Sequence, residues 1–147
     1  MNYKSFRILP ALLIMMFVAC NSSSESKKED DKLKTEQSLS EVDLTQGKLI
    51  YDRNCKVCHQ ANGQGIPNFY PPIVNTKHSK GDKDYLVKVL LYGLSGKVEI
   101  EGKTYNGVMA NYRNFSDEDI AAVLNYVRSM SDKNLEPVMP EDVAKFR

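Results

Sequence analysis

Two cysteines and a histidine make up the cluster with the clearest chemistry in this sequence. Cys55, Cys58 and His59 occur as Cys-Lys-Val-Cys-His. A gap of two residues lets both sulfurs reach the same edge of a porphyrin, where thiols add across the two vinyl groups of haem. The residue after the second cysteine then lies beneath the iron, so the His59 imidazole can serve as the proximal ligand. The motif predicts one covalently bound haem c.

Three other kinds of site use closely spaced cysteines, and the sequence supports each of them less well. A zinc site needs about four ligands, but the remaining cysteine and histidine, Cys20 and His78, are isolated. A thioredoxin-like motif would follow an apolar strand, whereas residues 44–54 are polar with a helical pattern. A disulfide between Cys55 and Cys58 would close a very tight loop and leave the histidine unexplained.

Length and charge limit the remaining functions. The chain has 147 residues, with 20 Lys and Arg interleaved with 19 Asp and Glu. This length allows one domain and additional segments. The sequence contains no basic stripe of the kind that binds nucleic acid, and no glycine-rich phosphate loop. We therefore expect no nucleic-acid partner.

The N-terminal residues predict an export signal. Lys4 and Arg7 precede an apolar run over residues 8–19, as in a secretory signal peptide. As a helix this run would span about 18 Å, well short of the ~30 Å hydrocarbon core of a membrane. Residues 17–20, Phe-Val-Ala-Cys, resemble a bacterial lipobox. We expect residues 1–19 to be a lipoprotein-type signal peptide and Cys20 to be lipidated; an ordinary signal peptide containing a cysteine is the alternative.

A charged segment follows the predicted signal. Residues 20–41 are mostly Ser, Glu, Lys and Asp, a composition that buries too little surface to offset its ordering entropy. We predict a lipid-anchored flexible linker with a reach near 25 Å. Export also agrees with the haem motif, because haem c is attached outside the cytoplasm. The predicted location is the periplasm or cell envelope, with the domain anchored to a membrane.

Residues 42–131 are predicted to form the haem domain. Helical patterning covers residues 44–54, 83–92 and 116–130. Asp82 suits the N-cap of the second helix, and Gly93 suits a left-handed stop after it.

Loops and a tail complete the predicted domain. Residues 60–79 and 94–114 are rich in Gly, Pro and Asn and read as loops, with a small hairpin over residues 98–105 as a further possibility. Protein atoms alone would make a thin core here, and a covalently held porphyrin would supply the missing centre. Residues 132–147 are predicted to be a C-terminal tail.

Several blocks of sequence occur in the order and spacing of a known family. They are residues 47–51 (GKLIY), 55–59 (CKVCH), 63–67 (GQGIP), 70–73 (YPPI), 105–109 (YNGVM) and 116–127 (SDEDIAAVLNYV). With these blocks, residues 43–130 resemble a class I cytochrome c of the bacterial monohaem type. The resemblance implies an all-α, cytochrome c-like fold, with three to four short helices and long loops wrapped around one covalent haem. It also implies that Gly47 and Tyr51 let the first helix cross the last one closely.

The resemblance assigns roles to individual positions. Pro71, or else Pro72, would supply the backbone carbonyl that accepts the ring N–H of His59 and fixes the orientation of the imidazole. Met109 would be the distal axial ligand, and its soft thioether would favour ferrous iron. Ala110 stands where the family commonly has a proline after this methionine.

Three other residues are candidates for the sixth ligand. Met130 lies on the apolar stripe of the last predicted helix, Met139 lies beyond that helix, and His78 is in a Lys-rich loop. A lone methionine often only fills a gap in a core. The position of Met109, in the loop before the last helix, favours it over these three.

The predicted reaction is outer-sphere transfer of one electron. With both axial positions filled, the iron cannot bind a substrate, so we expect redox proteins as partners and no small-molecule substrate. The predicted function is a membrane-tethered periplasmic carrier between a respiratory donor and acceptor. One alternative is a dedicated haem subunit of a terminal oxidase, reductase or periplasmic dehydrogenase, with residues 132–147 as a docking strap. A second is a ligand-binding haem sensor with an open distal site.

Overall fold

The computed structural model describes residues 42–147. The predicted signal peptide (1–19), the predicted lipidation site Cys20 and the predicted linker (20–41) lie outside the described residues. Within residues 42–147, no helix is both long enough and apolar enough to cross a membrane.

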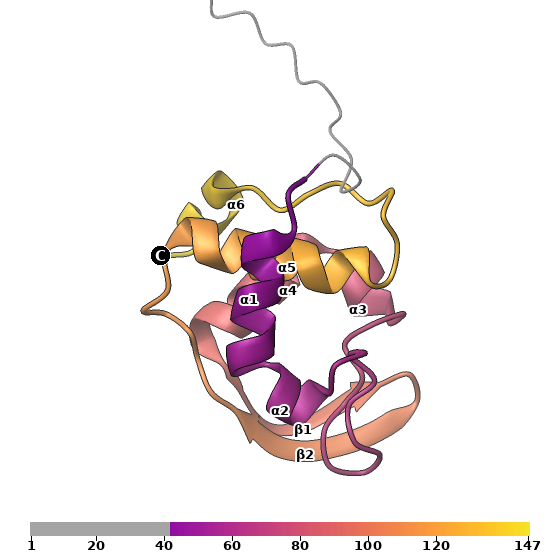
Figure 1. Cartoon of the computed structure of the whole chain (residues 1–147). Helices are drawn as coiled ribbons and strands as arrows, with labels where there is room; N and C mark the ends of the chain where they lie inside the picture. The colour runs from indigo at the N-terminus through magenta and orange to yellow at the C-terminus, as the bar shows by residue number, and fades with distance from the viewer. Residues whose placement is uncertain (1–41) are drawn as a thin grey trace, which may run out of the picture. The chain divides into compact units, whose positions relative to one another are not determined.

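The described chain folds into six helices and one antiparallel hairpin (Figure 1). In chain order they are α1 (Thr45–Asn54), α2 (Lys56–His59), α3 (Lys77–Lys80), α4 (Lys83–Tyr92), β1 (Leu94–Ile100), β2 (Lys103–Met109), α5 (Asp117–Ser129) and α6 (Pro140–Ala144). The three predicted helices are confirmed as α1, α4 and α5. The other three have four or five residues each, too few for hydrophobic periodicity to indicate them.

Capping side chains mark the starts of α4 and α5. The Asp82 carboxylate accepts a hydrogen bond from the Asp84 N–H (2.8 Å), and Gly93 follows α4 with a φ of 75°. At the start of α5, Ser116 Oγ accepts from the Asp119 N–H (3.1 Å). Acidic residues fill the first turn of α5, where negative charge favours the positive end of the helix dipole.

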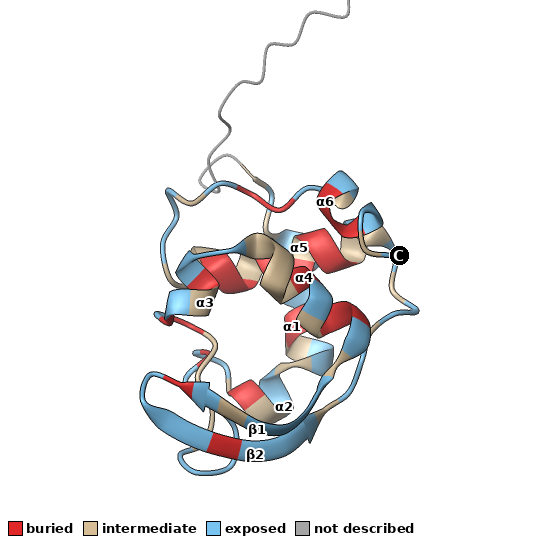
Figure 2. Ribbon diagram, turned by 180° about the vertical axis from the view of Figure 1, so that it is seen from behind, coloured by how far each residue is buried: buried red, intermediate tan, exposed pale blue. Residues whose placement is uncertain are grey.

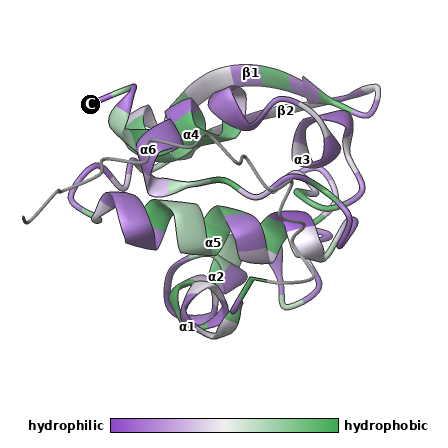
Figure 3. Ribbon diagram, turned by 90° about the horizontal axis from the view of Figure 1, so that it is seen from above, coloured by the Kyte–Doolittle hydropathy of each residue, from purple (hydrophilic) through white to green (hydrophobic). Residues whose placement is uncertain are grey.

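Helices α1 and α5 cross at a glycine. A Cβ atom on Gly47 would lie 2.1 Å from the carbonyl oxygen of Ala122 and 2.9 Å from Tyr126 Cβ. Tyr51, one turn later in α1, is completely buried, and its ring centroid lies 5.3 Å from that of Tyr126. Figure 3 shows hydrophobic residues recurring between hydrophilic ones along α5. The hydrophobic residues of this helix supply much of the core; they are Ile120, Ala121, Val123, Leu124 and Val127.

The hairpin shows that the predicted all-α class holds only in part. Strands β1 and β2 pair in register from Leu94 opposite Met109 to Ile100 opposite Lys103, where the sequence predicted a loop with at most a short hairpin. The turn residues Glu101 and Gly102 both have positive φ (49° and 75°), as in a type I′ turn. Both strands are exposed at most positions (Figure 2). The pairing extends beyond residues 98–105 to mostly exposed positions, where no alternation of polar and apolar residues indicates a strand.

The C-terminal residues 132–147 pack on their own domain. Helix α6 lies against α5 and α4, and Val138 and Val143 are among the most deeply buried side chains. The buried Asn125 of α5 holds this segment in place: its Nδ2 donates to the Val138 carbonyl (2.9 Å), and its Oδ1 accepts from the Val138 N–H (2.7 Å).

An ionic cluster fixes α6 to the start of α4. The nearly buried Asp142 accepts from Lys83 Nζ and Lys145 Nζ, both at 2.8 Å, and from the Met139 N–H at 3.0 Å. Burial acts to raise the pKa of Asp142, but the hydrogen bonds from Lys145, Lys83 and the Met139 amide outweigh it and hold the pKa well below its usual range.

Stability should therefore depend on the charge of Asp142. Because its pKa is lower in the folded state than in the unfolded chain (about 3.9), the contribution is complete above about pH 4 and is lost as the pH falls further. We expect Asp142→Asn to lower the free energy of unfolding by about 2 kcal/mol at pH 7, the loss typical of hydrogen bonds to a charged group. The difference from wild type should shrink at pH 3.

Urea unfolding at pH 7, 5 and 3 measures this effect. Glu141→Gln is the matched control, because Glu141 is an exposed neighbour in the same helix. A penalty for Asp142→Asn that stays constant from pH 7 to pH 3 would show that the charge of Asp142 does not stabilise the fold.

Candidate haem site

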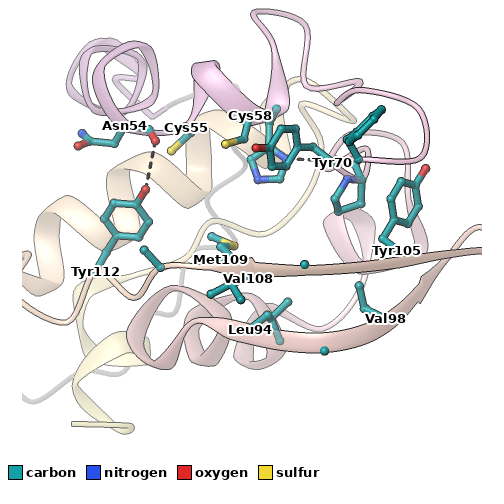
Figure 4. A pocket seen from close by; sticks show the side chains of 16 residues that line it. Asn54, Cys55, Cys58, Tyr70, Leu94, Val98, Tyr105, Val108, Met109 and Tyr112 are labelled. Atoms are coloured by element: carbon teal, nitrogen blue, oxygen red, sulfur yellow. Dashed lines mark hydrogen bonds between the residues drawn. The ribbon is translucent and has the colours of Figure 1, made fainter.

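A cavity of about 280 Å³ lies between the Cys-Lys-Val-Cys-His segment and the hairpin. Cys55 and Cys58 lie on one wall, and Met109 points towards them from the facing strand (Figure 4). Much of the remaining lining is apolar or aromatic, and includes Phe69, Tyr70, Pro71, Leu94, Val98, Tyr105, Val108 and Tyr112. Such a lining suits a large, flat and mostly apolar group.

The break between α1 and α2 places the two thiols and the imidazole at the cavity. Cys55 is the cap residue between α1 and α2, and its carbonyl accepts from the His59 N–H (2.9 Å). Residues three and four apart share one face of a helical turn, so Cys55, Cys58 and His59 line the same wall. Both cysteines are free thiols and half-buried. Burial, with a smaller contribution from Cys58, raises the pKa of Cys55 to about 11.

His59 is oriented by a backbone carbonyl. Its imidazole is buried, and Nδ1 lies 3.1 Å from the carbonyl oxygen of Pro71 rather than that of Pro72. Burial lowers the pKa of His59, against the opposing effect of this hydrogen bond. A neutral ring that donates from its proton-bearing Nδ1 to this carbonyl leaves the lone pair of Nε2 free. This is the form of imidazole that binds a metal.

Gly65 lets the Pro71 carbonyl approach His59. It has a φ of 67°, and a Cβ atom there would lie 2.5 Å from the Pro71 oxygen and 2.2 Å from the Tyr70 oxygen. Its own N–H donates to the His59 carbonyl (3.0 Å). A side chain at this position would push the Pro71 loop away from the imidazole. The sequence indicated a Gly-rich loop here but not this contact.

Met109 lies at the end of strand β2, not in a loop as the sequence suggested. Its side chain is half-buried and lines the cavity. Gly93 packs against its backbone, since a Cβ atom on Gly93 would lie 2.5 Å from the Met109 carbonyl oxygen. The strand therefore holds this methionine on the wall opposite the cysteines.

The other candidates for a sixth ligand lie elsewhere in the described structure. Met130 packs against the hydrophobic core, Met139 is the N-cap residue of α6, and the ring of His78 stacks on that of Tyr85 with centroids 4.5 Å apart. None of the three lines the cavity.

The side chains around the cavity fit a covalently attached haem. Two reduced thiols lie side by side, an imidazole nitrogen is available next to them, and a thioether faces them across an apolar space. This is the donor set of a c-type haem with histidine and methionine as axial ligands. Among residues 42–147 there is no cluster of three or more His, Cys, Asp or Glu of the kind that a zinc site would use.

Two tyrosine hydroxyls at the site were not predicted from the sequence. Tyr51 donates to the Gln60 carbonyl (2.6 Å), directly after His59, and Tyr112 donates to the Asn54 carbonyl (3.1 Å), directly before Cys55. Both partners are backbone atoms, so no spacing of residue types signals either bond.

Comparison with known proteins agrees with this chemistry. Residues 44–131 match the Cytochrome c family model. The chain is 42% identical over 110 residues to cytochrome c-552 of Thermus thermophilus, and the aligned region covers 69% of this chain and 83% of that protein. It is also 29% identical over 105 residues to the cytochrome c subunit of a quinone alcohol dehydrogenase from Gluconobacter oxydans, but this covers only 22% of that subunit. The chain belongs to the cytochrome c family, as a class I monohaem member that carries covalent haem c and transfers electrons rather than acting as an enzyme.

Proposed function

We propose that this protein is a membrane-tethered periplasmic cytochrome that passes single electrons between respiratory redox proteins. Cys55 and Cys58 are the thioether residues, and His59 and Met109 are the axial ligands. The observation that best supports this proposal is that both thiols, His59 and Met109 line one cavity, with Met109 facing the thiols (Figure 4). The bound haem would supply a ferrous–ferric couple.

The protein's own residues keep that couple confined to electron transfer. Pro71 fixes the plane of the His59 ring, so the ligand keeps its orientation in both oxidation states. The apolar walls limit the access of water, and the Met109 thioether favours the ferrous state. With His59 and Met109 as the two axial ligands, no coordination position of the iron is left for a substrate.

Replacing Met109 with alanine tests the distal ligand. We expect wild-type protein in the reduced state not to bind carbon monoxide, and Met109→Ala to bind it promptly because one coordination position is open. The potential of the variant should fall by on the order of 0.1 V or more, within the ~0.8 V range over which axial ligands set haem potentials.

Met130→Ala is the matched control for this experiment. Met130 is also a partly buried methionine, but it packs on the core away from the cavity. Its variant should lose stability and still exclude carbon monoxide. An alanine at position 109 that leaves the reduced protein inert to carbon monoxide would rule out ligation by Met109.

The proposed anchor rests on Cys20 and the charged linker 20–41. Two or three acyl chains at Cys20 would hold the domain at a membrane firmly, where one would not. We expect Cys20→Ser to move the haem protein from the membrane to the soluble fraction of lysed cells. A variant that stays in the membrane fraction after a high-salt wash would contradict lipid anchoring.

One comparison favours a second function, as a dedicated subunit. The relative from Gluconobacter oxydans is the cytochrome c subunit of a quinone alcohol dehydrogenase, so a dehydrogenase is a candidate host for this chain. Stable co-purification with one enzyme at high salt would favour the subunit. A complex that dissociates as ionic strength rises would favour a mobile carrier, because salt screens contacts between exposed charges.

A further inference from the structure

Tyr112 connects the two walls of the haem cavity. It lies three residues after Met109, on the segment that leaves β2, and its hydroxyl reaches the carbonyl of Asn54, the residue before Cys55 (Figure 4). The ring is half-buried and lines the cavity beside the thiols. One side chain therefore joins the methionine segment (residues 109–112) to the haem-attachment segment (residues 54–59).

The Asn54 carbonyl is available because α1 and α2 do not form one continuous helix. In an unbroken α-helix this carbonyl would accept from the N–H four residues later, that of Cys58. Instead, the N–H groups of Cys58 and His59 both donate to the Cys55 carbonyl, at 3.2 and 2.9 Å. The Tyr112 hydroxyl supplies the donor that the helix does not, at 3.1 Å.

The other end of this connection is anchored to α4. The Tyr112 N–H donates to the Leu90 carbonyl at 2.7 Å, and Gly93 packs against the backbone of Met109 and Asn111. The Tyr112 ring also lies against Phe115, with centroids 5.2 Å apart. The backbone of the methionine segment is therefore fixed to α4. The hydrogen bond of the Tyr112 hydroxyl then sets the distance between this segment and the haem-attachment segment.

We infer that Tyr112 is a positioning residue that holds the Met109 thioether against the iron by tying its segment to the backbone next to Cys55. This inference rests on the proposed function, since it takes Met109 as the sixth ligand. Tyr112 is not itself a ligand in this arrangement and acts through the separation of the two walls. Without its hydroxyl, the methionine segment moves away from the cysteines more readily, and an added ligand displaces Met109 more easily.

Titration of the ferric holoprotein with imidazole tests this inference, with Tyr112→Phe as the variant. Phenylalanine keeps the ring and removes only the hydroxyl. Loss of one hydrogen bond of ordinary strength predicts that imidazole binds about fivefold more tightly. The long-wavelength sulfur-to-iron absorption band should weaken at a lower imidazole concentration than in wild type.

Tyr92→Phe is the matched control. The Tyr92 hydroxyl also donates to a backbone carbonyl, that of Phe146, but this residue does not line the cavity. Its variant should have the imidazole affinity of wild type even if its melting temperature falls as much as that of Tyr112→Phe.

Two results would overturn the inference, and they can be told apart. If wild type shows the sulfur band and Tyr112→Phe binds imidazole with unchanged affinity, Tyr112 does not position Met109, and the proposed function stands. If wild type lacks the band and binds imidazole freely, Met109 is not a ligand, and the proposed function fails together with the inference.

Discussion

A protein in which Cys55 and Cys58 are both replaced by serine is expected to carry no covalent haem and to lose most of its stability. The thiols are the groups that would attach the porphyrin, and serine keeps their size without their nucleophilic sulfur. The cavity of about 280 Å³ would then remain as apolar space without its covalent filling. At about 24 cal/mol per Å³ of unfilled cavity, the loss is up to roughly 7 kcal/mol, comparable with the whole stability of a small domain.

Haem staining of a denaturing gel and far-ultraviolet circular dichroism measure this result. Val57→Ala is the matched control, because Val57 lies between the cysteines in the motif and is 77% exposed. It should retain covalent haem and wild-type unfolding. Stained haem on the double serine variant, or cooperative unfolding at the wild-type midpoint, would show that the cysteines are not the attachment residues or that the fold does not depend on them.

Replacing Gly47 with alanine is expected to destabilise the domain by about 3 kcal/mol, at the upper end of the usual cost of overpacking. The added methyl carbon would lie 2.1 Å from the Ala122 carbonyl oxygen and 2.7 Å from its carbon. Both are backbone atoms of α5, so no side-chain rotation relieves the overlap and the two helices must separate. Helix propensity acts in the opposite direction, since alanine is favoured over glycine inside a helix by about 1 kcal/mol.

The sign of the effect therefore distinguishes packing from propensity. Thr45→Ala, at an exposed position in the first turn of the same helix, should change the free energy of unfolding by less than about 0.5 kcal/mol. Chemical unfolding of the holoprotein gives both values. A Gly47→Ala variant that is as stable as wild type, or more stable, would mean that α1 and α5 do not depend on close contact at this glycine.

The features that the sequence predicted well depend on neighbouring residues. Helices α1, α4 and α5 were expected from apolar spacing, and Asp82 and Gly93 mark the ends of α4 as predicted. The Cys55–His59 motif places its functional atoms within one helical turn, so its chemistry could be read without a structure. The family resemblance, in turn, pointed to Met109 and Pro71, both of which lie at the cavity.

The features that the sequence missed depend on contacts between distant residues. The sequence indicated at most a short hairpin over residues 98–105, whereas the paired strands run from Leu94 to Met109. The additional positions are mostly exposed, so no pattern indicated that the pairing extends over them. Tyr112 bonds to a backbone carbonyl 58 residues away, and any residue type presents such a carbonyl. Asn125 similarly holds the tail through the backbone of Val138, which leaves no sign in the composition of residues 132–147.

The visible absorption spectrum of the mature wild-type protein tests the central claim, that His59 and Met109 both hold the iron. It should be recorded in the oxidised and reduced states, with and without carbon monoxide. We predict a long-wavelength sulfur-to-iron band in the oxidised protein and a reduced spectrum that carbon monoxide does not change. Absence of that band together with prompt carbon monoxide binding would contradict the account and indicate an open iron.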